Sequence, residues 1–315
     1  MDPRTIDVEV DQTSWKSSLP SDIAALAGKG SISLSVEVAL LITALITRPP
    51  EIRGFSLADS WAWLRYRPAL TETNDLRLKS EWKDIDPHQK TILSDELGMG
   101  FTTYLLALEL DFRIIANTGY FVKVVTPGSY SLKASTKSGP RKSPDFVALD
   151  LHDRVNTFEC KGTQQSRESL FDLIDKGLAQ KENLVGSAGS TIHHSLVAGL
   201  FIPQFASKEN ALLHVRDPKK IEFDEFLRIV SLEQQQIAIV QIDLAKHFGL
   251  MGLQSIANAL SRRKVENNPR LLVEDDELGK LERMVVICIY LKLLSDCRLR
   301  LSEFGNGMLQ AWCLQ

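Results

Sequence analysis

Two short segments near the middle of the chain restrict its fold more than any other feature. Residues 143–150 have the sequence Ser-Pro-Asp-Phe-Val-Ala-Leu-Asp, and residues 155–161 have the sequence Val-Asn-Thr-Phe-Glu-Cys-Lys. Both are apolar or alternate between apolar and polar side chains, and a polar turn at 152–154 separates them. This pattern predicts two β-strands that pair as a hairpin in a small sheet.

The predicted hairpin brings three charged side chains together. Successive side chains of a strand point to opposite faces, so Glu159 and Lys161 share one face and Cys160 lies on the packed face. Asp145 begins the partner strand and approaches this pair. We interpret Cys160 as a small core residue rather than as a nucleophile. Two carboxylates and an ammonium group are therefore expected at one point of the sheet.

This group of side chains suits metal-dependent phosphate chemistry. Mg²⁺ takes oxygen ligands, and proteins typically hold it through one or two carboxylates together with water and substrate phosphates. A lysine beside the metal can orient or deprotonate the attacking water and offset the charge that develops on a phosphate. The alternative interpretation is that Glu159 and Lys161 belong to a solvated strand face and that Pro144-Asp145 is an ordinary turn.

The same residues resemble the signature of the PD-(D/E)XK nuclease superfamily, which is Pro-Asp followed at some distance by (Asp/Glu)-X-Lys. Here Pro144-Asp145 is followed by thirteen residues and then by Glu159-Cys160-Lys161. The resemblance covers residues 86–205, well under half of the chain. It implies that Asp145 and Glu159 bind Mg²⁺, with Mn²⁺ as an alternative, and that Lys161 is the catalytic lysine.

The superfamily often adds a carboxylate from the helix that precedes the sheet. Apolar side chains at i, i+3 and i+4 predict such a helix from Asp86-Pro87 onward. Glu96 lies beside this apolar stripe and is the predicted third metal ligand. Glu109 and Asp111, at the helix end, are the alternatives.

The other predicted elements also have the order that this resemblance implies. Strands are predicted at 112–116 and 120–125, before the hairpin, and a helix from about residue 166 and a strand at 195–203 follow it. The predicted fold class is therefore α+β, with an αβββαβ core of the restriction-endonuclease type.

The predicted domain organisation places this core at residues 86–215. Residues 1–85 are expected to form a helical N-terminal region, in which the apolar segment 31–47 is one buried helix. Residues 216–315 are expected to form a helical C-terminal region.

Polar residues on both sides of the hairpin are candidates for binding nucleic acid. Four cations lie in a serine-rich loop directly before Asp145, where they could hold phosphates without regard to base sequence. Gln164 follows Lys161 closely and could reach the attacking water or a DNA backbone. A solvated loop and a polar turn are the alternatives. The four cations are Lys133, Lys137, Arg141 and Lys142.

Two further features concern the neighbourhood of the hairpin. Gly98 and Gly100, in the long predicted helix, permit close approach of a neighbouring strand or of a ligand backbone. His193 and His194 precede the last predicted strand, and adjacent side chains alternate faces, so at most one can point at the site. We expect both histidines to be structural.

Composition limits the remaining possibilities. The net charge of −3 does not by itself indicate nucleic-acid binding, so the expectation depends on the local basic loop. No uncharged apolar stretch is long enough to span a membrane, and the polar, acidic start is unlike a secretory signal, so we expect a cytoplasmic protein. Four cysteines without Cys-X-X-Cys spacing give no support to a zinc site or a disulfide framework.

The sequence thus predicts a Mg²⁺-dependent nuclease that acts on DNA. By analogy with the superfamily, its role is in restriction, phage defence or repair, as a homodimer or beside a helicase or other ATPase. The alternatives are a catalytically silent nucleic-acid-binding or scaffold protein that keeps the fold, or an RNase.

Overall fold

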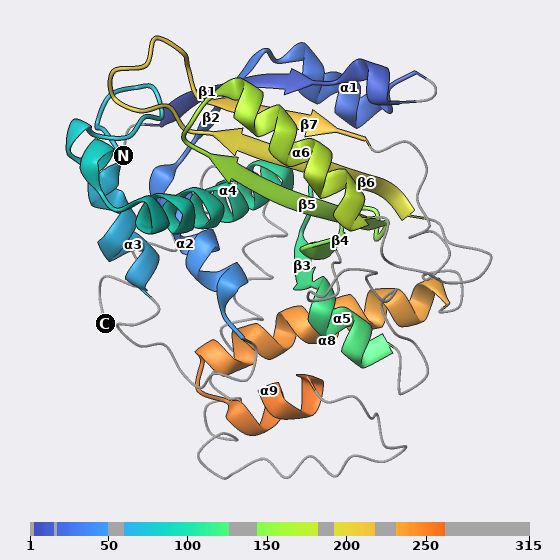
Figure 1. Ribbon diagram of the computed structural model, residues 1–315. Coiled ribbons are helices and arrows are strands. Elements are labelled where there is room, and N and C mark those ends of the chain that lie inside the picture. The colour runs from blue at the N-terminus through green and yellow to red at the C-terminus, as the bar shows by residue number, and fades with distance from the viewer. Residues whose placement is uncertain are drawn as a thin grey trace, which may run out of the picture.

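The computed structural model describes residues 3–15, 18–49, 60–125, 144–181, 192–217 and 231–261. Its centre is a seven-stranded sheet with the strand order β2-β1-β7-β6-β5-β4-β3 (Figure 1). The strands are β1 (Arg4–Val10), β2 (Ser31–Leu34), β3 (Ile114–Asn117), β4 (Phe146–Leu149), β5 (Val155–Thr163), β6 (Ile192–Phe201) and β7 (Leu212–Arg216).

The sheet is mixed. β5 pairs in parallel with β6, and β1 pairs in parallel with β7, whereas the other neighbouring strands are antiparallel. Parallel neighbours need a crossover connection, and α6 (Arg167–Lys181) lies between β5 and β6 in the chain. The predicted hairpin of β4 and β5 is present. A mixed sheet packed with helices confirms the predicted α+β class.

Helices surround this sheet. Besides α6 they are α1 (Ser21–Gly28), α2 (Val36–Thr47), α3 (Trp61–Tyr66), α4 (Pro87–Glu109), α5 (Thr118–Val125), α8 (Leu232–Leu250) and α9 (Gln254–Ser261). Short 3-10 segments occur at Gln12–Ser14, Arg67–Ala69 and Ser80–Asp84.

The helices α4 and α6 cover opposite faces of the sheet. Gly162 of β5 faces the backbone of α4, whereas Gly199 of β6 faces Leu170 and Ile174 of α6. Gly162 pairs with Leu200, the neighbour of Gly199, so the two glycines lie on opposite faces. Figure 1 shows α5 and α8 at the β3–β4 end of the sheet, and α8 packs on β3. The β4–β5 hairpin therefore lies inside the molecule.

The predicted long helix is confirmed as α4. Asp86 caps it by accepting a hydrogen bond from the His88 N–H at 2.8 Å, and Pro87 occupies the first turn, where its missing N–H is no loss. Leu97 and Phe101 belong to its buried face. Gly98 lies directly against Gly162, which confirms the predicted close approach of a strand.

Residues 120–125 form most of α5 rather than the predicted strand. Phe121 is fully buried and packs in one apolar cluster with Ile239 and Ile242 of α8. Packing against α8 stabilises a helix here, because apolar side chains three and four residues apart then lie on one face. The local sequence pattern alone did not indicate this contact.

The prediction of one helix over residues 31–47 is also wrong. Ser31–Leu34 alternate between exposed and buried positions and form β2, and the Ser35 hydroxyl then caps α2 by accepting a hydrogen bond from the Val38 N–H. The N-terminal region, expected to be helical, thus contributes β1 and β2 to the sheet. In the C-terminal region α8 and α9 are helical as predicted, and residues 262–315 lie outside the described part.

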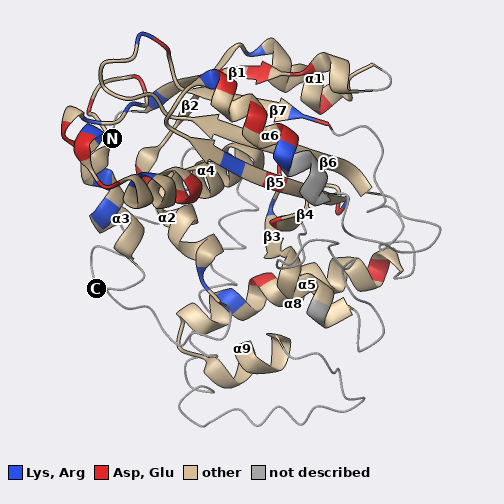
Figure 2. Cartoon of the chain, viewed as in Figure 1, with Lys and Arg blue, Asp and Glu red and all other residues tan. Residues whose placement is uncertain are grey.

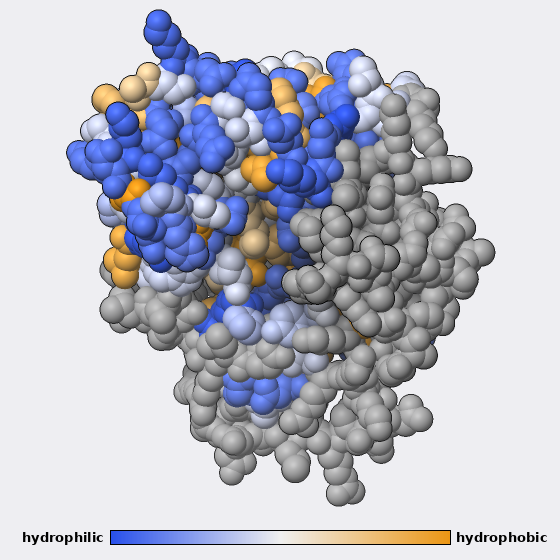
Figure 3. All heavy atoms as spheres, viewed as in Figure 1, coloured by the Kyte–Doolittle hydropathy of each residue, from blue (hydrophilic) through white to orange (hydrophobic). Residues whose placement is uncertain are grey.

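Within the described residues, no helix is long and apolar enough to cross a membrane. The described surface on the face shown in Figure 3 is mainly hydrophilic, with small apolar areas between the polar side chains.

Candidate functional site

The β4–β5 hairpin brings the three predicted catalytic side chains together. Extending the antiparallel pairing one residue beyond Phe146 and Phe158 places Asp145 opposite Glu159. Lys161, two residues further along β5, forms an ion pair with Glu159. The two carboxylates and the ammonium group therefore meet, as the sequence predicted, and we call them the carboxylate centre. Their catalytic and metal-binding roles stay predictions.

Each carboxylate of this centre is held from the hairpin itself. Asp145 Oδ2 accepts a hydrogen bond from the Cys160 backbone N–H at 2.8 Å. The Glu159 side chain is only 1% exposed, and its Oε1 pairs with Lys161. Its second oxygen, Oε2, is buried and has no hydrogen-bond partner among the described residues. Buried polar atoms are nearly always paired. The backbone and the side chain of Asp145 both interact with the Glu159 carboxylate, so a proton shared by the two acids or a bound cation would satisfy this oxygen.

Burial and repulsion disfavour the charged forms of both carboxylates. Burial raises the pKa of Glu159 to about 8, and the charge of Asp145 adds to the shift while Lys161 opposes it. Burial likewise raises the pKa of Asp145, although the Cys160 N–H and Lys161 oppose the shift. Two adjacent buried carboxylates resist being ionised together at neutral pH.

Asp95 of α4 interacts electrostatically with this centre, and the sequence did not predict it. Partial desolvation raises the pKa of Asp95, and the charge of Lys161 opposes this shift. Asp95 in turn raises the pKa of Asp145. Figure 2 shows acidic positions on α4 and a basic position on β5, and these two elements pack together.

A signal for Asp95 was present in the sequence. Gly98 marks the face of α4 that meets β5, because a Cβ there would lie 2.6 Å from the backbone nitrogen of Gly162. Residues three and four positions apart share a helix face, so Asp95 lies on the Gly98 side and Glu96 is turned away by about 100°.

The predicted third ligand, Glu96, contacts α3 instead. Its carboxylate accepts a hydrogen bond from the Tyr66 hydroxyl, and burial raises its pKa against the opposing charge of Arg65. Of the alternatives, Glu109 forms an ion pair with Lys29, and Asp111 follows the helix with a positive φ of 54°. These contacts of Glu96 and Glu109 are to other parts of the chain, and the metal-binding role of Glu96 stays a prediction.

The predicted nucleic-acid-binding residues are only partly described. Gln164 is buried, and its amide donates hydrogen bonds to the Lys90 carbonyl at 2.8 Å and to Ser94 Oγ at 3.0 Å. Its oxygen accepts a hydrogen bond from Gln204, so this side chain ties α4 to the sheet. Lys133, Lys137, Arg141 and Lys142 lie outside the described residues.

Cys160 is buried, as predicted, with its sulfur 3.6 Å from the Thr103 hydroxyl of α4. Burial and the neighbouring carboxylates raise its thiol pKa well above the ordinary value. The thiolate is the nucleophilic form of cysteine, so a thiol that stays neutral can pack in the core but is a poor nucleophile.

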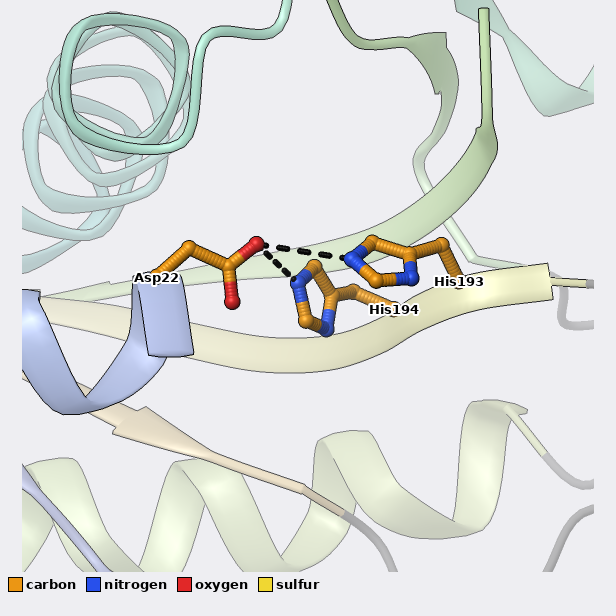
Figure 4. A group of neighbouring side chains, drawn as sticks. All are labelled: Asp22, His193 and His194. Atoms are coloured by element: carbon orange, nitrogen blue, oxygen red, sulfur yellow. Dashed lines mark hydrogen bonds and ion pairs between the residues drawn. The ribbon is translucent and has the colours of Figure 1, made fainter. Parts of the chain in front are cut away.

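The prediction that His193 and His194 point to opposite faces is wrong. Both Nε2 atoms lie near Oδ2 of Asp22 in α1, at 3.4 Å for His193 and 2.8 Å for His194 (Figure 4). Burial raises the pKa of Asp22, but hydrogen bonds and charge from His194 and the Ile23 N–H outweigh it and hold the pKa at about 2. Asp22 is therefore ionised at neutral pH.

The chain matches no protein-family model, and no curated protein and no solved structure is similar to it. Functional assignment therefore depends on the geometry of the carboxylate centre and of the group formed by Asp22, His193 and His194.

Proposed function

We propose that the protein is a Mg²⁺-dependent nuclease of the PD-(D/E)XK kind that hydrolyses phosphodiester bonds of DNA. The observation that carries this proposal is the buried Glu159 carboxylate, which lies beside Asp145 and Lys161 and has one unpartnered oxygen. Such an oxygen is unfavourable unless something binds it. A hard divalent cation is a suitable partner, because it takes carboxylate oxygens and offsets their mutual repulsion.

The residues present fit Mg²⁺, with Mn²⁺ as an alternative. Asp145 and Glu159 would hold the cation, and Asp95 replaces Glu96 as our proposed third carboxylate. When bound, Mg²⁺ would stabilise charge on the phosphate and lower the pKa of a bound water.

The remaining groups hold and complete this centre. The Cys160 N–H fixes the Asp145 carboxylate, and the Lys161 side chain, 19% exposed, stays accessible from solvent beside it. Its ammonium can donate to a phosphate oxygen or orient a water. The chain order α4, β3, β4, β5, α6, β6, with β5 and β6 parallel, agrees with the αβββαβ pattern, apart from α5 between β3 and β4. A role in restriction, phage defence or repair, with a partner ATPase or as a homodimer, extends this proposal by analogy.

The test is a cleavage assay of the purified protein with supercoiled, linear and single-stranded DNA and with RNA, in Mg²⁺ or EDTA. We expect Mg²⁺-dependent cleavage of DNA that Asp145→Asn, Glu159→Gln and Lys161→Ala each abolish. Asp153→Asn is the matched control, because Asp153 is an exposed carboxylate in the same hairpin with φ of 56°, a conformation that asparagine tolerates.

A second pair of variants tests the assignment on α4. Asp95→Asn should lower Mg²⁺-dependent cleavage, whereas Glu96→Gln should leave it near that of the wild type. Cleavage restricted to RNA would support the RNase alternative. Absence of cleavage, together with Mg²⁺ affinity that Asp145→Asn does not change, would support the scaffold alternative.

A further inference from the structure

A β-bulge at the start of β6 turns two histidines to one side. The register between β5 and β6 shifts between Val155 and Thr157, so His193 and His194 lie opposite the single residue Asn156. Bulges of this kind re-aim side chains and are over-represented next to functional sites. The fully buried Asn156 holds the bulge, because its Oδ1 accepts a hydrogen bond from the His194 N–H at 3.1 Å.

The two imidazoles converge on one carboxylate from a different element. We propose that Asp22, His193 and His194 form a metal site for Zn²⁺ or a similar transition-metal ion. One ligand atom from each residue can be chosen so that all three lie within 4.8 Å of one another. Ligand atoms on a tetrahedral ion with bonds of about 2.0–2.1 Å are about 3.3 Å apart. The Asp22–His193 distance of 3.4 Å already fits, and the Asp22–His194 distance of 2.8 Å must widen by about 0.5 Å.

The donor set selects the class of metal. Two imidazole nitrogens and one carboxylate oxygen suit Zn²⁺ and its neighbours, whereas Mg²⁺ prefers oxygen ligands only. The His194 side chain is 3% exposed, but those of His193 and Asp22 are 27% and 26% exposed. Three protein ligands with solvent at one side leave room for a fourth ligand, as in zinc sites that bind water.

The positive charge of Arg154 opposes a cation at this cluster. An Arg154 NH2 group lies 3.8 Å from Asp22 Oδ2, yet its Nε is 2.6 Å from Asp150 Oδ2. The closer partner keeps the guanidinium in place, so Asp22 can turn to a metal ion without leaving Arg154 unpaired.

The proposed site is separate from the carboxylate centre. Val197, three residues beyond His194, pairs with Glu159, so the two clusters are about 10 Å apart along the strands. This inference does not depend on the proposed nuclease chemistry.

The experiment is a titration of the purified full chain with Co²⁺, followed by the visible absorption of tetrahedral Co²⁺ and then by displacement with Zn²⁺. We expect one Co²⁺ per chain to give the tetrahedral absorption band, and Zn²⁺ to displace that ion completely. His193→Gln, at a partly exposed ring, should lower Co²⁺ affinity by about tenfold or more, since even supporting residues cost that much. Asp22→Asn should do the same.

Two variants serve as controls. His152→Gln removes an exposed histidine from the nearby hairpin turn, and Asp145→Asn alters the carboxylate centre; both should keep wild-type Co²⁺ affinity. Absence of the absorption band in the wild type would overturn the proposal. So would a band that His193→Gln retains at unchanged affinity, because the cobalt would then be bound elsewhere. Circular dichroism of each variant checks folding, and His193→Gln decides the question if Asp22→Asn does not fold.

Discussion

Gly98→Ala should destabilise the protein, although alanine is the better helix former. Gly98 lies inside α4, where replacing glycine by alanine ordinarily stabilises a helix by about 1 kcal/mol. At this position, however, the new methyl group would lie 2.6 Å from the backbone nitrogen of Gly162 and 2.8 Å from the carbonyl carbon of Lys161. Both neighbours are backbone atoms of β5, so no side-chain rotation can relieve the overlap.

The size of the effect follows from this overlap. Favourable contact between carbon atoms begins at about 3.5 Å, so α4 and β5 must separate by more than about 0.7 Å (3.5 − 2.8 at the Lys161 carbon), because Gly162 Cα is nearer still. Overpacking of a close-packed interior costs about 1–3 kcal/mol, and sometimes more. Because the overlap is between backbones, we take the upper end of this range. After the gain of about 1 kcal/mol in helix propensity, we expect the free energy of unfolding to fall by about 2 kcal/mol. The separation also weakens the electrostatic interaction of Asp95 with Lys161, so the proposed nuclease activity should fall as well.

Chemical denaturation with urea, followed by circular dichroism, measures this change. Gly119→Ala is the matched control, because Gly119 also lies in a helix but nothing is within 4 Å of a Cβ there. That variant should be as stable as the wild type or more stable by up to about 1 kcal/mol. If Gly98→Ala matched the stability of Gly119→Ala, the argument from close approach would be refuted.

Three other residues give shorter predictions. Burial lowers the pKa of Lys246 from 10.5 to about 8, so the unfolded chain binds more protons between these values and the free energy of unfolding rises with pH there. In urea titrations Lys246→Met should lose this rise with pH. Phe158→Ala should cost about 3–5 kcal/mol by calorimetry, because the ring stacks at 5.6 Å on Phe112 and packs at 5.2 Å on Phe146. Cys160 should resist iodoacetamide in the folded chain and react after denaturation, as measured by peptide mass spectrometry.

The parts of the fold that the sequence predicted are those with a strong local pattern. The β4–β5 hairpin, the helix α4 and the meeting of Asp145, Glu159 and Lys161 follow from alternation, a capped apolar stripe and a short turn. The errors have a common cause in contacts between distant segments. Residues 120–125 became helical because α8 covers Phe121, and β2 formed because β1 pairs with it.

Two pairs of adjacent polar residues show why residue type and spacing are insufficient on their own. Asp95 and Glu96 are adjacent acids, and the phase of α4 against Gly162 decides which of them lies on the side of the helix that meets β5. His193 and His194 are adjacent on a strand, and one extra residue in the β5–β6 pairing turns both toward Asp22. In each case a backbone contact sets the direction of the side chain. A glycine packed against backbone, or a bulge, is therefore the feature from which a neighbouring site should be sought.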